Sequence, residues 1–379
     1  MKTVVIAGYA RSPFTPSKKG DLARVRPDEL AAQVVRALIE RSGVKPEDIE
    51  DLILGCAFPE GEQGLNLARL VVLLADLPLS VGGVTVNRFC GSSMQSVHNA
   101  AGAIRMGAGE VFICAGVESM TRVPMMGYNP LPHPGLHAKR PESYIGMGDT
   151  AENVARQWEI PRAAQEEFAV RSHRKASSAQ AEGRFKDEIV AITDGNRRIE
   201  VDGCIRPETT AEALAELKPA FDQTGTVTAG TASPLTDGAA AVLVCSLDYA
   251  ESHGLTPLAG IRSIAISGCA PEVMGIGPVK ASGKALERAG LRADQLDVVE
   301  LNEAFASQSL ACIRDLGLSE EKVNLDGGAI AIGHPLGATG ARIVGKAAAL
   351  LKRTGGRYGL ATQCIGGGQG IATLLEAVR

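Results

Sequence analysis

The chain carries the same short sequence pattern twice, once in each half. Residues 41–50 read RSGVKPEDIE, and residues 288–297 read RAGLRADQLD. In both, a helical pattern ends at a glycine, which commonly caps a helix, and the chain continues into an apolar run typical of a strand. The repeat predicts two similar α/β halves. The alternative is that two helix–glycine–strand turns resemble each other by chance.

Strand-like and helix-like patterns alternate within each half. In the first half we expect strands at 4–8, 52–55, 84–87 and 111–116, with helices at 28–39 and 92–105. In the second half we expect strands at 323–325 and 358–362 and a helix at 337–351. Such alternation favours a parallel sheet covered by helices on both faces.

The segment between the halves has a different composition. Methionine and proline cluster at 123–134, and a polar helical stretch follows at 150–180. We interpret 118–234 as an inserted loop domain over one face of the core, where substrate-binding loops usually lie. The predicted first half is then 1–117 plus about 235–257, and the second half is 258–379.

Composition limits the classes of function. Apolar residues make up 45% of the 379, charged residues make up 22%, and the net charge is -4, which fits a soluble globular protein and offers no broad basic field for nucleic acid. The eight cysteines include no Cys-x-x-Cys pair, which favours reduced thiols and a cytoplasmic location. No run of about 18 apolar residues occurs, so we expect no membrane span, and the apolar run at the first residues is too short for a signal peptide.

Cys90 lies between an expected strand and an expected helix, in the segment NRFCGSSM. A helix N-terminus favours the thiolate and lowers the pKa of a thiol. This setting is typical of a nucleophile on a sharp turn. The alternative is a buried structural cysteine, the more common role.

Two further residues lie in glycine-rich segments. His334 is in GHPLG, and Cys364 precedes three glycines in CIGGG. Glycine allows backbone N–H groups to approach a developing oxyanion closely. Either residue could instead be an ordinary core or surface side chain.

Asn302 and Glu303 follow the apolar run 298–299, at the end of an expected strand. Polar residues at the carboxyl ends of parallel strands often belong to sites in α/β proteins. Asn302 could also cap a helix, and the two roles are compatible.

Two other patterns carry less weight. Residues 340–347 nearly match a phosphate-binding loop, but Ala347 replaces the serine or threonine that holds the metal, and the segment falls in an expected helix. His133 and His137 have metal-ligand spacing, but we expect Pro134 and Gly135 to break a helix there. The sequence predicts no metal site.

Taken together, these segments resemble the thiolase family over nearly the whole chain. Four blocks carry the resemblance, 87–95, 302–305, 327–342 and 364–370, and the segments 150–155 and 233–240 add to it. The resemblance implies an α/β fold of two duplicated halves in five αβαβα layers, with a loop domain inserted in the first half.

The resemblance also implies roles for individual residues. Cys90 would hold the acyl group, His334 would activate it, and Cys364 would exchange a proton with the acetyl-CoA carbon. Asn302 would hold the thioester oxygen with His334 through a water, and the N–H groups of Cys90 and Gly366 would form a second oxyanion site. The expected substrate- and coenzyme A-binding residues are Ser233, Arg206, Met147 and Phe305.

Two departures indicate a subclass. Short-chain biosynthetic members usually carry a histidine where this chain has Gly146, and the segment PMMGY at 124–128 resembles broad-range degradative members. We therefore expect a 3-ketoacyl-CoA thiolase of fatty-acid β-oxidation, an acetyl-CoA acyltransferase. The alternatives are an acetoacetyl-CoA thiolase working in the condensing direction and a catalytically silent thiolase-like subunit. A decarboxylating ketoacyl synthase normally has histidine where Cys364 stands.

The family resemblance implies a homodimer or a dimer of dimers, which could join a hydratase/dehydrogenase partner subunit. Acyl-CoA would be the substrate, and coenzyme A the co-substrate. No further cofactor is expected.

Overall fold

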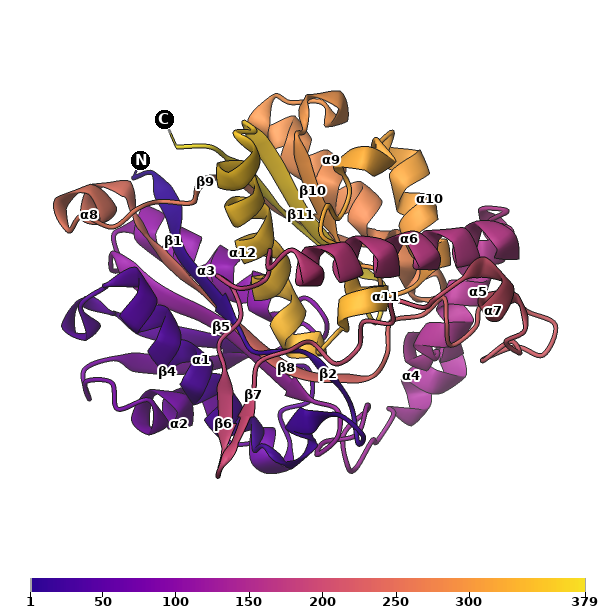
Figure 1. The fold of residues 1–379 in the computed structure, drawn as a ribbon, viewed down its shortest axis with the longest axis horizontal. Coiled ribbons are helices and arrows are strands. Elements are labelled where there is room, and N and C mark those ends of the chain that lie inside the picture. Colours follow the sequence, from indigo (N-terminus) through magenta and orange to yellow (C-terminus); the bar gives the residue numbers. More distant parts are fainter. Residues whose placement is uncertain (1, 379) are drawn as a thin grey trace.

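The computed structural model describes residues 2–378 and arranges them in five layers (Figure 1). Two groups of strands are separated by a central helical layer, and each carries further helices on its outer face. The first group has the order β4-β3-β5-β8-β1 and the second the order β9-β12-β11-β10. The groups meet where β1 pairs with β9 through Val5↔Gly260 and Ile6↔Ala259. The predicted fold of two similar halves is confirmed.

The strands of the first group are β1 (Val4–Arg11), β3 (Asp51–Gly55), β4 (Gly82–Val86), β5 (Val111–Ser119) and β8 (Thr236–Ser246), with the short β2 (Thr15–Pro16) beside β8. Those of the second group are β9 (Ala259–Gly268), β10 (Val298–Leu301), β11 (Tyr358–Ile365) and β12 (Gln369–Glu376).

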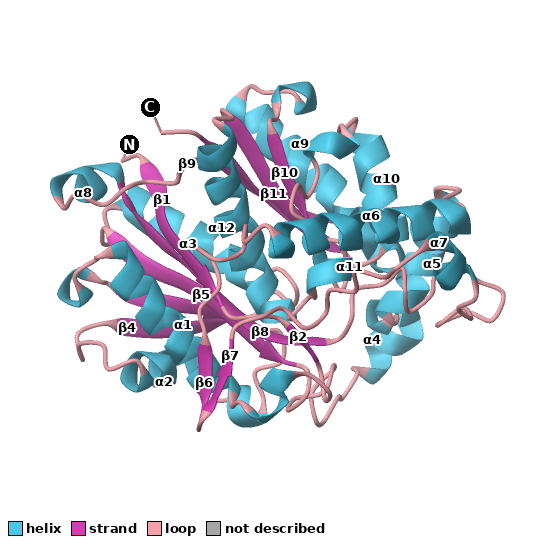
Figure 2. Ribbon diagram, viewed as in Figure 1, coloured by secondary structure: helices cyan, strands magenta, loops and turns pink. Residues whose placement is uncertain are grey.

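The central layer consists of α3 (Ser92–Met106) and α12 (Leu336–Thr354), which Figure 2 shows between the two groups of strands. Their apolar side chains share one cluster with strands from both halves, including Val97, Ile343, Ile53 and Ile371. The two helices approach closely because Gly340 has no side chain: a Cβ there would lie 2.2 Å from the Met94 nitrogen. Residues 340–347, which nearly match a phosphate-binding loop, therefore form a buried packing face of α12. The helix predicted for this segment is present.

The outer layers differ between the halves. Helices α1 (Pro27–Ser42) and α2 (Leu67–Leu74) cover the first group of strands, and α9 (Gly277–Ala289) and α10 (Ala306–Leu316) cover the second. The short helices α8 (Leu247–Ser252) and α11 (Ala329–Ile332) lie on connections. Among residues 2–378, no helix has both the length and the apolar composition needed to cross a membrane.

The sheet is mixed, whereas the sequence predicted a parallel one. β3 runs parallel to β4 and β5, and β10 runs parallel to β11, but β1, β8, β9 and β12 pair antiparallel to their neighbours. The reason is clearest at β11 and β12, which a short glycine turn connects. A tight turn joins only antiparallel strands, because a parallel pair needs a long crossover.

The predicted strand at 323–325 is wrong. Only Val323 pairs with β10, through a single bridge to Val299. The side chain of Asn324 takes the place of the next backbone pair: its Oδ1 accepts from the Leu301 N–H and its Nδ2 donates to the Leu301 carbonyl, both at 2.9 Å. Asn324 has a φ of 48°, which turns the chain away from the sheet.

The inserted segment contains more regular structure than its sequence indicated. It has α4 (Pro134–Lys139), α5 (Met147–Gln157), α6 (Arg162–Ala181), β6 (Ile192–Asp194), β7 (Arg197–Ile199) and α7 (Ala211–Ala215). The predicted helical stretch 150–180 is two helices that part before Pro161. The expectation that Pro134 breaks a helix is also wrong, because proline fits the first turn of α4. The domain boundaries stay predictions.

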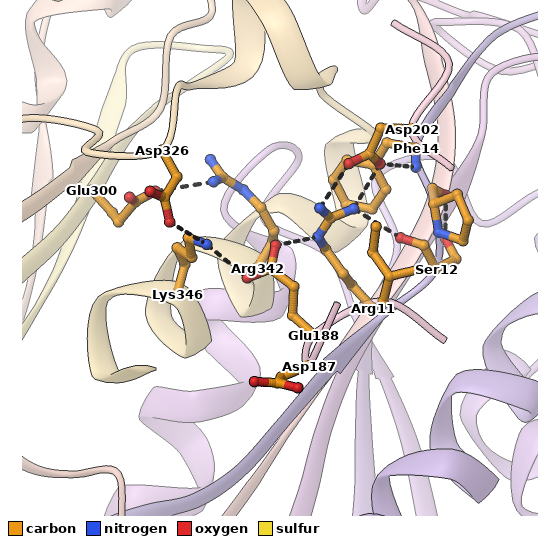
Figure 3. A network of polar contacts seen from close by, with 12 residues as sticks. Arg11, Ser12, Phe14, Asp187, Glu188, Asp202, Glu300, Asp326, Arg342 and Lys346 are labelled. Carbon is orange, nitrogen blue, oxygen red and sulfur yellow. Dashed lines mark hydrogen bonds and ion pairs between the residues drawn. The ribbon is translucent and has the colours of Figure 1, made fainter. Parts of the chain in front are cut away.

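Buried ion pairs attach this segment to the core (Figure 3). Arg11 on β1 donates to both carboxylate oxygens of Asp202 at 2.7 and 2.8 Å and to Glu188 at 2.8 Å. Lys346 on α12 bonds to Glu188 at 2.9 Å and to Asp326 at 2.8 Å. Arg11 and Lys346 are almost fully buried. Removing one partner of such a pair would leave an uncompensated buried charge.

Candidate active site

Cys90 lies at a sharp turn that precedes α3. The helix begins at Ser92, and Ser92 Oγ closes the turn by accepting from the Arg88 N–H at 2.9 Å and donating to the Phe89 carbonyl at 2.6 Å. Phe89 has a φ of 42°, a conformation that a non-glycine residue adopts only when its surroundings impose it. The turn therefore fixes the direction of the Cys90 side chain.

Cys90 is buried in a small apolar cluster with Ala57, Met120 and Leu336. Burial raises the pKa of Cys90 to about 11, although the N–H groups of Gly366 and of Cys90 itself face the sulfur and act in the opposite direction. The increase in the Cys90 pKa from desolvation thus outweighs the decrease that the sequence predicted from the N-terminus of the following helix. Cys90 is a thiol at neutral pH and needs a base to become a nucleophile.

His334 lies between α11 and α12, where its environment defines the protonation of its ring. Thr339 Oγ1 donates to the Pro335 carbonyl at 3.0 Å and lies 2.6 Å from His334 Nδ1. The Thr339 oxygen must then accept from Nδ1–H, which leaves Nε2 as the unprotonated nitrogen. Burial, followed by the nearby Arg342, lowers the pKa of His334 to about 3. The imidazole is therefore neutral and can accept a proton at Nε2.

Asn302 follows β10 directly and lies beside this nitrogen. Its Nδ2 is 3.3 Å from His334 Nε2, and its backbone N–H bonds to the Thr362 carbonyl at 3.0 Å. Its Oδ1 is buried and has no hydrogen-bond partner among residues 2–378. The N-cap of α10 is Phe305, so Asn302 does not cap that helix. Asn302 Oδ1 can therefore accept a hydrogen bond from a small polar group beside His334.

Cys364 lies near the end of β11, in front of the glycine turn to β12. Gly367 and Gly368 have φ of 79° and 82°, which only glycine adopts readily. Burial raises the pKa of Cys364 well above its usual range, and the proximity of Cys90 is the next cause. Cys364 is therefore a second thiol that holds its proton at neutral pH, close to the first.

The predicted binding residues divide into two groups. Met147 and Phe305 pack in one apolar cluster with Cys364, and Ser233 bonds through its N–H to the Ala304 carbonyl at 2.9 Å. Arg206 is instead exposed on the inserted segment, where its N–H bonds to His173 Nδ1 at 3.1 Å. The structure thus gathers three of the four around Cys364 and the 304–305 loop, and Arg206 lies outside that group.

Sequence reasoning missed Glu118, a buried carboxylate beside Cys90. It accepts from the Ala57 N–H at 2.8 Å, the Gly337 N–H at 2.9 Å and Gln63 Nε2 at 2.8 Å. It therefore joins the apolar wall around Cys90 to the loop that carries His334. The sequence signal for Glu118 is that an acidic residue directly continues the apolar run 111–117, which indicates a buried carboxylate.

Comparison with known proteins agrees with this arrangement. The family model described as the thiolase N-terminal domain matches residues 4–248, and the model of the thiolase C-terminal domain matches residues 255–377. The chain is 48% identical over 389 aligned positions to a protein named 3-ketoacyl-CoA thiolase from Bacillus subtilis, covering 99% of this chain and 100% of the relative.

Proteins of the same name from Idiomarina loihiensis and Vibrio cholerae are each 50% identical, over 388 and 387 positions. The first alignment covers 100% of both chains, and the second covers 99% of this chain and 100% of the relative. Matches of this extent include every block that carried the resemblance. The chain belongs to the thiolase family.

Proposed function

We propose that this protein is a 3-ketoacyl-CoA thiolase, an acyltransferase that cleaves 3-oxoacyl-CoA with coenzyme A. The observation that carries the proposal is that two buried thiols lie together at the Gly366 turn, while a neutral histidine, whose unprotonated Nε2 can accept a proton, lies two residues before Leu336 of the Cys90 cluster. A base, a nucleophile and a proton donor are what carbon–carbon cleavage of a 3-oxothioester needs.

In the first half-reaction, His334 Nε2 takes the proton of Cys90, and the thiolate attacks the 3-keto carbon. The C2–C3 bond breaks, and its electron pair passes into the thioester as an enolate. Asn302 and protonated His334 hold the thioester oxygen, with a water carried by the Asn302 amide. Cys364 gives its proton to C2, and acetyl-CoA leaves the acylated Cys90.

The second half-reaction restores both thiols. The Cys364 thiolate takes the proton of coenzyme A, whose sulfur attacks the acyl carbon on Cys90. The N–H groups of Cys90 and Gly366, which both face the Cys90 sulfur, stabilise the oxyanion. The shortened acyl-CoA leaves, and Cys90 recovers its proton from His334. Acyl transfer through an enzyme-bound intermediate predicts ping-pong kinetics.

Coenzyme A would enter along the inserted segment. We place its pantetheine arm beside Ser233, Met147 and Phe305, which lie around Cys364. The exposed Arg206 offers a cation for the phosphate groups near the adenine end of coenzyme A. No cofactor other than this co-substrate is needed for the chemistry.

The relatives' name supports action on 3-ketoacyl-CoA, and the Gly146 position supports a degradative role on a range of chain lengths, which we place in fatty-acid β-oxidation. All eight cysteines are free thiols, which supports a cytoplasmic location. We also propose a homo-oligomer. β4 is the end strand of its sheet, and Leu65, Leu79 and Val84 expose apolar side chains at or near it. An open strand edge with apolar side chains suits pairing with a second copy.

The test is coenzyme A-dependent cleavage of 3-oxoacyl-CoA substrates from C4 to C16. Release of acetyl-CoA from medium and long chains is the expected result. Cleavage confined to C4 would indicate acetoacetyl-CoA metabolism, and a protein that cleaves no member of the series would be a silent subunit.

A further inference from the structure

The end of β11 and the glycine that follows it contact the Cys90 turn at three points, although the two segments belong to different halves. Gln363 Nε2 donates a hydrogen bond to the Cys90 carbonyl oxygen. Ile365 packs so closely that a Cβ on Gly91 would lie 2.5 Å from its Cδ1. The Gly366 N–H faces the Cys90 sulfur. Of these contacts, only the first comes from a polar side chain.

From this arrangement we propose that Gln363 is a positioning residue, which holds the Cys90 turn so that the sulfur faces the Gly366 N–H. The inference rests on the proposed function, in which this N–H helps to stabilise the acyl oxyanion. Gln363 does not touch the reacting atoms. It acts through the backbone of Cys90.

The hydrogen bond fixes which end of the amide faces Cys90. Two carbonyl oxygens carry no hydrogen and cannot form a hydrogen bond with each other, so the nitrogen of the Gln363 amide must point at the Cys90 carbonyl. Its Oε1 is then buried with no partner within the described chain. An unpaired buried acceptor is unfavourable, whereas an apolar side chain of the same size would carry no such cost. The contribution of the amide at this position is therefore its bond to Cys90.

The turn requires a restraint of this kind. Phe89 holds a left-handed conformation immediately before Cys90. Such a conformation persists only where surrounding contacts impose it. A fixed Cys90 carbonyl limits rotation about the Cα–C bond of Cys90 and so limits the relaxation of the turn. Since Gln363 precedes Cys364 on the same strand, the bond also sets the two thiols relative to each other.

The experiment compares the parent with Gln363→Met, which keeps the size of the side chain and removes the donor. The rate of Cys90 alkylation by iodoacetamide is measured at several pH values and located by peptide mass spectrometry. Loss of thiolate stabilisation by Gly366 should lower this rate about tenfold near neutral pH, as expected for a weakened hydrogen bond to a charged group. The kcat for thiolysis should fall with it, while KM for coenzyme A stays the same.

Thr373→Val is the matched control. Thr373 Oγ1 lies 2.9 Å from His98 Nε2 and joins β12 to α3, so its loss also removes a buried bond between the same two layers. This variant should lower the midpoint of thermal unfolding but leave Cys90 alkylation within about twofold of the parent. Gln363→Leu, a shorter side chain, replaces Gln363→Met if methionine prevents folding.

A Gln363 variant whose Cys90 is alkylated at the parent rate and whose kcat equals that of the parent would overturn the inference. An equal decrease of the alkylation rate in Thr373→Val would also overturn it. Failure of the parent to cleave any 3-oxoacyl-CoA would instead overturn the proposed function, because alkylation of Cys90 is measured without substrate.

Discussion

Thr339 determines which nitrogen of His334 carries the proton. Its hydroxyl donates to the Pro335 carbonyl at 3.0 Å, so its oxygen can only accept from His334 Nδ1, at 2.6 Å. Both residues are buried, and Asn302 lies on the other side of the ring, 3.3 Å from Nε2. The unprotonated Nε2 of His334 therefore lies on the Asn302 side of the ring, where the proposed reaction needs it to accept a proton.

Thr339→Val keeps the shape of the side chain and removes this acceptor. We expect kcat to fall roughly 10- to 100-fold, because the ring loses the bond that selects its tautomer and stabilises its charged form. Steady-state thiolysis with a single 3-oxoacyl-CoA would measure the change. Thr339→Ser, which keeps the hydroxyl, is the control, and an equal loss in both variants would argue against the tautomer as the cause.

Mutants should distinguish the role of the Cys90 thiol from that of the Cys364 thiol. Cys90→Ser should lose nearly all thiolysis, because a serine hydroxyl is a far weaker nucleophile at neutral pH. Cys364→Ala removes the proton donor, and we expect turnover to fall about 100- to 10,000-fold while Cys90 still reacts with iodoacetamide. Turnover of Cys90→Ser close to the parent rate would contradict the assignment.

Buried histidines should make the fold less stable in mild acid. Burial lowers the pKa of His98 and of His334 to about 3, and that of His173 to about 4. The unfolded chain therefore binds more protons than the folded one from about pH 6.5 down to these values, so stability falls as pH falls through this window. Glu300 acts in the opposite sense, because burial raises its folded pKa to about 7.

His98→Gln removes one of these protons. The slope of unfolding free energy against pH should decrease by about 1.4 kcal/mol per pH unit between roughly pH 5 and 6. Urea unfolding at successive pH values measures the slope. If it equals that of the parent, His98 is not neutral in the folded protein.

Breaking the ion pair between β1 and the inserted segment should destabilise the fold strongly. Asp202→Asn leaves the buried Arg11 without its bidentate partner, and we expect a loss of about 3–5 kcal/mol in unfolding free energy. Asp294→Asn is the control, since Asp294 and its partner Arg292 are mostly exposed and solvent screens such a pair, so this change should leave stability nearly the same. Equal losses in urea unfolding would contradict a special role for the buried pair.

The sequence was most informative where glycine and a reactive side chain occur together. Local rules place Cys90 before a helix, and the repeated turn predicts two halves. They do not reveal the Asn324 side chain that replaces a strand pair, since its conformation depends on Leu301. Arg11 and Asp202 lie 191 positions apart, and no local pattern connects them. Glu118 leaves only a weak sequence signal and Gln363 leaves none, because both gain their contacts from packing across the two halves.

Helix α12 is buried on all sides, and this burial makes the two duplicated halves depend on each other for folding. Nearly every residue of this helix from Leu336 to Leu351 is enclosed by strands from both halves and by α3. A fragment ending near residue 257 would lose this helix and expose the apolar surfaces of α3 and of its own strands to water. The two halves repeat the same pattern but share a single apolar interior, so we expect neither half to fold alone. The core of the first half is complete only after α12, near the C-terminus, has been synthesised.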